Sequence, residues 1–279
     1  MIDTILHYQF MQNALGACLL ASILCGIIGV IVVEKHLVMM SGGIAHTSYG
    51  GVGLGYFLGV EPILGAFFFS VCAALGIGYM QSKGKKYSDV VISLFWSLGM
   101  ALGILFVGLM PGYPPDLSSY LFGSILSVTK SDLILMSSLT VIVVIVIFSF
   151  YQQWQSYLFD EEFAAVIGMK TTLLKYTLLI LIALTVVVMI RVVGIILVLA
   201  LLTAPAAAAA IFTRKLKSRM FLAIFLSTVF CISGLWVSYN LNIASGAAIV
   251  ILSILGYLAC SLMRSLWRNH KMKDVLRKA

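Results

Sequence analysis

The chain is a series of apolar segments, each close to the roughly 20 residues that a helix needs to cross a bilayer. Nine such segments are expected, at about 12–33, 38–58, 62–80, 89–109, 132–151, 172–190, 194–213, 220–238 and 245–266. The short run 119–128 could be a half-span or a re-entrant helix, so eight or ten spans would also fit. The pattern predicts one all-α domain over residues 1–279, a polytopic transmembrane helical bundle of about eight to nine spans.

The composition agrees with a membrane protein. Of 279 residues, 62% are hydrophobic and only 10% are charged, and the mean hydropathy is +1.10. The first apolar run is too long, and too regularly followed by others, for a cleaved signal peptide. The five cysteines lie in apolar runs without metal-type spacing, so we expect buried thiols.

Lysine and arginine predict the orientation. With a cytoplasmic C-terminus, 16 of the 18 fall in cytoplasmic segments, including the basic tail 267–279; Lys130 and Arg191 fall outside. An odd number of spans then places the N-terminus outside. We expect Arg191 to begin the segment 194–213 and to extend towards water. The net charge of +8 therefore indicates basic loops at a membrane and not a nucleic-acid partner.

The acidic residues argue against a stand-alone carrier. None of the ten lies in the middle of a predicted span, whereas proton- or sodium-driven carriers usually keep carboxylates near the midplane. The chain also lacks a GxxxxGK[ST] phosphate loop. If ATP drives this protein, a separate subunit must bind and hydrolyse it, and the chain itself is not an enzyme. The absence of HExxH or a comparable ligand cluster disfavours a membrane metalloprotease.

One histidine is predicted inside a span, in the glycine-rich stretch 40–59. His46 has Gly42 and Gly50 one turn to either side, with Gly43 and Gly53 on the same face. These glycines leave space beside the imidazole and are candidates to line a pathway. An ionisable group in a membrane suggests function. The alternative is a neutral histidine that is hydrogen-bonded to a neighbouring helix.

A second glycine pattern follows that histidine. Gly51, Gly55 and Gly59 recur every four residues, which is typical of helices that pack closely in lipid. Pro205, in the middle of the segment 194–213, removes a backbone hydrogen bond, so a kink is expected there. The proline-rich loop 110–117 could be a docking surface or a plain connector.

The cytoplasmic loop 152–171 is longer than a connector requires. Asp160 is a candidate N-cap, and Glu161 and Glu162 suit the first turn of a short helix. Its apolar face would be formed by Phe163, Val166 and Ile167, and Gly168 would end it. Because its acidic start disfavours an anionic lipid surface, we expect a protein partner.

Several stretches together resemble the membrane subunit of zinc- and manganese-type ABC importers. They are the N-terminal region through SGGIAHTSYGGVGLGYFLG, LFGSIL at 121–126, FDEEFAAVIGM, VVGIILVLALLTAPAAAAA at 193–210 and the glycine-bearing last span. The likeness runs in order from about residue 9 to 262. It implies a homodimeric permease that works with an extracellular metal-binding solute-binding protein and an ATPase subunit.

The resemblance also implies residue roles. The helix from Asp160 to Met169 would be the coupling helix, with Ala164 among the residues that meet the ATPase. His46 matches the histidine of the family's metal site, but Gly42 stands where an aspartate is common.

Two-fold symmetry would supply a second imidazole, and a sparse site suits an ion that must also leave. The loss of the aspartate favours zinc slightly over manganese as the transported divalent metal, since imidazole suits zinc and oxygen ligands suit Mn(II). No permanently bound cofactor is expected. A secondary cation carrier or channel, or an ABC permease for a chelated metal, remains the alternative.

Overall fold

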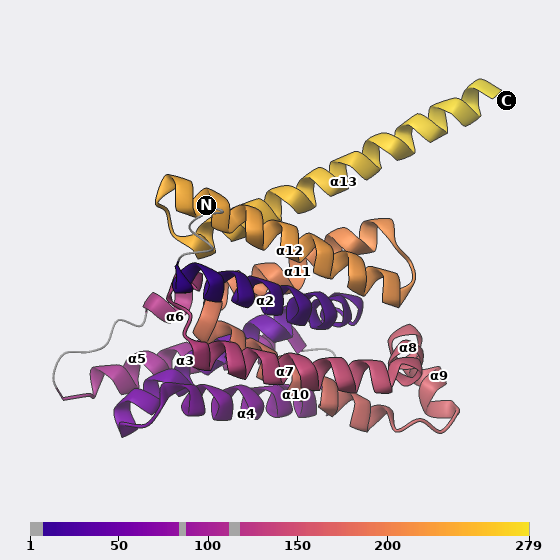
Figure 1. The fold of residues 1–279 in the computed structure, drawn as a ribbon. Helices are drawn as coiled ribbons and strands as arrows, with labels where there is room; N and C mark the ends of the chain where they lie inside the picture. Colours follow the sequence, from indigo (N-terminus) through magenta and orange to yellow (C-terminus); the bar gives the residue numbers. More distant parts are fainter. Residues whose placement is uncertain (1–7, 84–87, 112–117, 279) are drawn as a thin grey trace.

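The computed structural model describes residues 8–83, 88–111 and 118–278, which form helices and no strand (Figure 1). The long helices are α2 (Gln9–Glu34), α3 (Val38–Leu58), α4 (Pro62–Lys83), α5 (Ser88–Gly108), α7 (Lys130–Ser149), α10 (Thr171–Val193), α11 (Ile195–Phe212), α12 (Leu216–Leu241) and α13 (Ser245–Lys278). Each of the nine predicted segments therefore corresponds to one helix. The ends differ by a few residues, except that α13 continues into the basic tail.

Eight of the described helices are long and apolar enough to cross a membrane. The ninth long helix, α3, has a sufficient length of 21 residues, but glycine, serine and histidine lower its hydropathy. It is nevertheless enclosed, because α4 and α5 pack along it and α10 contacts it as well. The all-α transmembrane prediction is confirmed, and α3 is a buried helix within the bundle.

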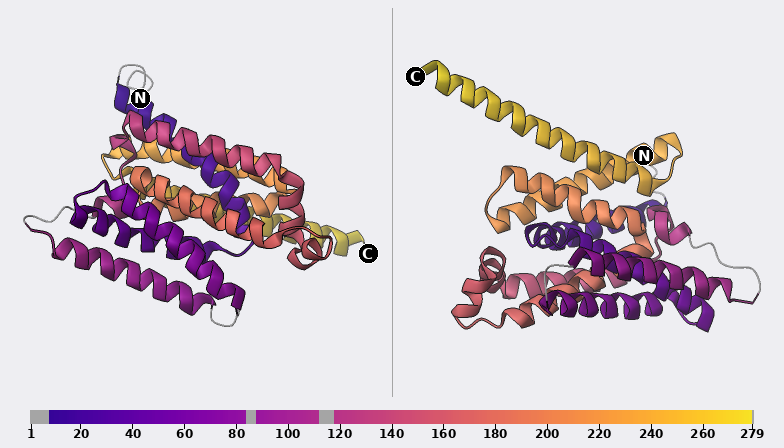
Figure 2. Two further views of the ribbon diagram at one scale, coloured as in Figure 1. Left: turned by 90° about the horizontal axis from the view of Figure 1, so that it is seen from below. Right: turned by 180° about the vertical axis from the view of Figure 1, so that it is seen from behind.

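The helices form two packed groups (Figures 1 and 2). One group contains α2, α11, α12 and α13, and the other contains α3, α4, α5 and α10. Among the eight candidate spans, α2 and α10 are the most enclosed, since 72% of the residues in their most apolar stretch are buried. In α5 and α13 the corresponding share is 22%. The far part of α13 extends away from the other helices (Figure 1).

Short elements fill the end of the bundle where α3 and α10 finish, which we call the predicted outer end. The expected half-span is only α6 (Ser118–Phe122) and the 3₁₀ helix η2 (Ile125–Ser127), so it does not cross the bundle. Gly123 and Gly194, both with positive φ, meet there backbone to backbone, and a Cβ on either would collide with the other segment. Residues 112–117 of the proline-rich loop lie outside the described residues.

The structure corrects the expectation for the cysteines and leaves the kink at Pro205 as a prediction. Cys18, Cys25 and Cys231 are buried, but Cys72 is exposed and Cys260 half-buried, so the expectation of five buried thiols is wrong for two. Cys72 and Cys260 are the two that reach the surface of the bundle. The helix α11 continues through Pro205, and a kink there stays a prediction.

Candidate functional site

His46 lies on α3 about 12 Å from its first residue, at 1.5 Å of rise per residue. Its imidazole ring stacks on the indole of Trp96 from α5, with centroids 4.0 Å apart and planes 9° from parallel. The Nδ1 atom is buried and has no hydrogen-bond partner among the described residues. The structure therefore pairs this histidine with an aromatic face.

Three of the glycines that flank His46 lie against α5. A Cβ on Gly50 would collide with the carbonyl of Gly99, and one on Gly53 with the carbonyl of Gly103. A Cβ on Gly43 would collide with the side chain of Ile92. These residues let the two backbones approach closely, and a role in lining a pathway stays a prediction for them.

Gly42 differs from its neighbours because it has room. The nearest atoms to an added Cβ would be Trp96 Cζ3 at 3.7 Å and Leu199 Cδ2 at 3.8 Å, which is ordinary van der Waals contact. The glycines of the second pattern, Gly51, Gly55 and Gly59, have two different roles. Gly51 and Gly55 pack against α4 as expected, whereas Gly59 has left-handed φ and caps the end of α3.

One protomer offers few metal ligands. No group of three or more His, Cys, Asp or Glu side chains that could hold a metal occurs among the described side chains of residues 8–82, 89–111 and 120–267. A transition metal normally takes four or more donors. His46 alone would therefore need further donors from water, backbone carbonyls or a second copy of the chain.

The predicted coupling helix is present as α9 (Glu161–Val166), which follows α8 (Tyr151–Phe159). Asp160 caps it as predicted, since its Oδ1 accepts the backbone N–H of Phe163 at 2.9 Å. Gly168, at φ +85°, lies just beyond its end. The side chains of Phe163, Val166 and Ile167 are exposed by 58, 85 and 50%, while Ala164 is fully buried. An apolar face is thus left uncovered in the protomer.

The helix α9 is tied to the segment that leads into α3. Lys35, just after α2, places its Nζ 3.1 Å from a carboxylate oxygen of Glu161 and 3.8 Å from the centroid of the Tyr157 ring. The lysine side chain is only 16% exposed. Burial and the nearby Glu161 carboxylate raise the pKa of Tyr157, which keeps its hydroxyl protonated. This contact joins α9 to the linker before the histidine-bearing helix.

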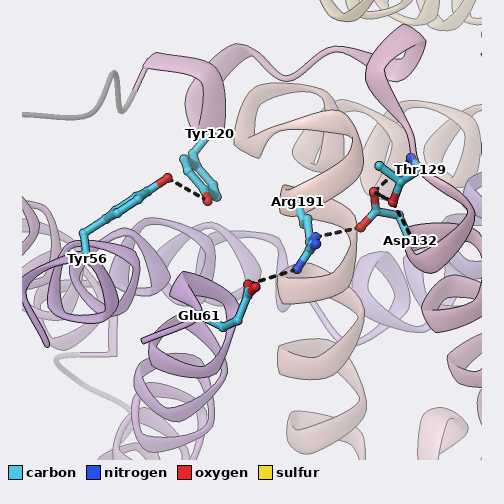
Figure 3. Close-up of polar contacts among 6 residues, drawn as sticks. All are labelled: Tyr56, Glu61, Tyr120, Thr129, Asp132 and Arg191. Atoms are coloured by element: carbon cyan, nitrogen blue, oxygen red, sulfur yellow. Dashed lines mark hydrogen bonds and ion pairs between the residues drawn. The ribbon is translucent and has the colours of Figure 1, made fainter. Parts of the chain in front are cut away.

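A second polar cluster lies at the predicted outer end (Figure 3). Arg191, in the last turn of α10, donates its Nε to Asp132 at 2.6 Å and places Nη1 3.7 Å from Glu61. These side chains line a cavity of about 470 Å³ together with Tyr56 and Tyr120, whose hydroxyls lie 3.3 Å apart. Burial and this hydrogen bond raise the pKa of Tyr120.

The expectation for Arg191 is therefore wrong in two ways. It belongs to the end of α10 and not to the next segment, and it forms ion pairs instead of extending freely into water. Asp132 holds it firmly, because the same carboxylate also accepts the backbone N–H and hydroxyl of Thr129 in a capping box. The signal was present in the sequence, because Arg191 was one of only two basic residues assigned to the outer segments, and the neighbouring outer segments carried the acids Glu61 and Asp132.

Comparison with known proteins decides the family. A model of the ABC 3 transport family matches residues 7–264. The chain belongs to this family. It is 44% identical over 253 residues to the uncharacterized membrane protein slr2045 of Synechocystis, covering 91% of this chain and 90% of that one. It is 34% identical over 252 residues to the manganese transport system membrane protein MntC of Listeria monocytogenes, covering 90% of each.

A solved structure agrees with this chain in fold. The structure described as PsaBC from Streptococcus pneumoniae in complex with Fab superposes with a TM-score of 0.84 at 31% identity, covering 93% of each chain. The resemblance noted from the sequence is thus confirmed, and with it the role of a membrane permease subunit, which is not an enzyme. The slight preference for zinc finds no support among these relatives.

Proposed function

We propose that this ABC 3 family member is the membrane subunit of an importer that moves Mn(II) into the cell. The observation that carries the metal site is an imidazole inside α3 that is only half-buried and that no described side chain or backbone group binds through Nδ1. Because Nδ1 is itself enclosed, Nε2 would be the atom that binds the metal. The relative from Listeria is named for manganese transport, which directs the proposal to manganese in place of zinc. The alternative, a secondary cation carrier or a channel that works without ATP, does not fit membership of the ABC 3 transport family.

Three partners complete the proposal. A second copy of the chain places another His46 across a two-fold axis, so that two imidazoles, water and backbone oxygens form the coordination shell. An ATPase subunit binds the uncovered face of α9, formed by Phe163, Val166 and Ile167. An extracellular metal-loaded binding protein delivers the ion at the predicted outer end, and the C-terminus lies in the cytoplasm.

The weak donor set is suited to transport. A site that holds an ion too tightly would not release it, so few ligands and retained water favour passage. Of the four glycines near His46, Gly42 alone has room for a Cβ, whereas Gly43, Gly50 and Gly53 are packed against α5, so Gly42 is the one that would border the proposed pathway. In a homodimer the exposed part of the His46 imidazole would lie towards the axis.

The test is ATP-driven uptake by proteoliposomes that contain this chain with its ATPase and binding protein. Matched assays with Mn(II), Zn(II) and Mg(II) should show uptake of Mn(II) in preference to the other two. Equal or faster uptake of Zn(II) would contradict the choice of metal. Uptake of Mn(II) that proceeds without ATP would contradict the importer mechanism itself.

A further inference from the structure

The contact between His46 and Trp96 is held by the crossing of two helices. The hydroxyl of Thr47, the residue after His46, shares its proton between the carbonyl of Gly43 on α3 at 2.7 Å and the carbonyl of Phe95 on α5 at 3.0 Å. One turn further along α5, a Cβ on Gly99 would collide with the Cα of Thr47. The backbones are therefore in direct contact beside the two rings, and this fixes the relative positions of the imidazole and the indole.

The indole lies on the face of the imidazole and not at its edge. The lone pair with which a neutral imidazole binds a metal lies in the plane of the ring, so the indole does not cover it. The centroids are 4.0 Å apart at an interplanar angle of 9°, which is a face-to-face contact. Trp96 can thus restrain the ring without occupying a coordination position.

A histidine that binds metal usually has its second nitrogen held by a carboxylate or a carbonyl, which fixes the plane of the ring. The described part of this chain supplies no such partner for the buried Nδ1 of His46. One turn earlier, where a carboxylate could have stood, Gly42 leaves space that the edge of the indole borders at 3.7 Å from an added Cβ. Nδ1 stays without a partner, and the described contact that can restrain the ring is the aromatic one on its face.

We propose that Trp96 is a positioning residue for the cation site, orienting His46 through stacking so that a divalent transition metal meets a pre-set imidazole. The inference rests on the proposed function and adds a residue on a different helix to it. It also gives the close approach of α3 and α5 a role in addition to packing, because this approach places the two rings face to face.

The experiment measures Mn(II) binding to the purified permease–ATPase complex by EPR of the free ion, with pulsed EPR for nitrogen coupling to the bound ion. Trp96→Leu removes the aromatic face and keeps an apolar side chain, whereas Trp96→Phe keeps a face. We expect Trp96→Leu to weaken binding by about tenfold, as loss of an orienting partner does, and to reduce the nitrogen coupling. Trp96→Phe should restore both towards the wild type.

His46→Ala separates this inference from the proposed function. If His46→Ala binds Mn(II) as the wild type does, the site itself is wrong. If His46→Ala weakens binding but Trp96→Leu matches the wild type in affinity and nitrogen coupling, only the role of Trp96 is overturned. Equal losses in Trp96→Leu and Trp96→Phe would also overturn it. Size-exclusion chromatography and co-purification of the ATPase verify that each variant is folded.

Discussion

At the scale of the residue, the candidate metal site differs from the family pattern by one missing carboxylate. Gly42 stands where the resemblance leads one to expect aspartate, and a Cβ there would meet its neighbours at ordinary van der Waals distances. The stack on Trp96 could not be predicted from sequence, because it depends on how α3 and α5 cross. The sequence did single out His46, since a histidine among glycines is unusual in an apolar segment.

A first prediction restores the missing charge. A unit charge about 4 Å from a divalent cation contributes about 2 kcal/mol even in water, which is more than tenfold in affinity. Gly42→Asp should therefore tighten Mn(II) binding by more than about tenfold, measured by EPR of the free ion. The neutral Gly42→Asn is the matched control and should change binding little. Equal binding by Gly42→Asp and the wild type would place the cation elsewhere.

A second prediction concerns Arg191. Removing its guanidinium leaves the nearly buried Asp132 carboxylate without its charged partner, which costs about 1–3 kcal/mol. Arg191→Met should lower the temperature of thermal unfolding in nanodiscs by several degrees. Glu61, 69% exposed and 3.7 Å away, should contribute less than about 1 kcal/mol, so Glu61→Gln is the control.

The double variant Arg191→Met/Asp132→Asn extends that test. It removes both charges together and should be more stable than Arg191→Met alone, because no unpaired carboxylate is left. A larger loss in Glu61→Gln than in Arg191→Met would reverse the assignment of which pair matters.

At the scale of the element, periodicity and capping were the reliable signals. The nine long segments, the Asp160 cap and the glycine after α9 were all predicted and are all present. The contact of Lys35 with Glu161 and Tyr157 was not, because residues 126 positions apart give no local pattern. Likewise, the segment 118–127 was ambiguous, since only its packing against Gly194 shows that it stays at one end.

The exposed face of α9 gives a third prediction. Phe163→Asp places a charge where an apolar side chain would be buried against the ATPase, forfeiting about 1.5–3 kcal/mol of burial. Uptake per ATP hydrolysed should fall by roughly tenfold or more, while the permease still inserts into the membrane. Glu162→Gln, on the same helix but outside the apolar face, should transport normally. Normal uptake in Phe163→Asp would make α9 a passive linker.

At the scale of the whole molecule, one protomer forms the complete helical bundle, but its described side chains do not supply enough ligands for a metal ion. The distribution of lysine and arginine predicted which ends of the helices belong together. In the structure, Tyr56, Glu61, Tyr120 and Arg191 do meet at one end. A dimer axis produces no pattern in the sequence of one chain. The second His46 of the proposed dimer was therefore inferred from the small number of ligands that a single imidazole supplies.

The central claim is that His46 forms the site through which Mn(II) passes. It is tested most directly by uptake of radioactive Mn(II) into proteoliposomes that contain the assembled importer, comparing the wild type with His46→Ala. The account predicts that His46→Ala abolishes uptake while the ATPase still co-purifies with the permease. Uptake by His46→Ala at the wild-type rate would contradict it.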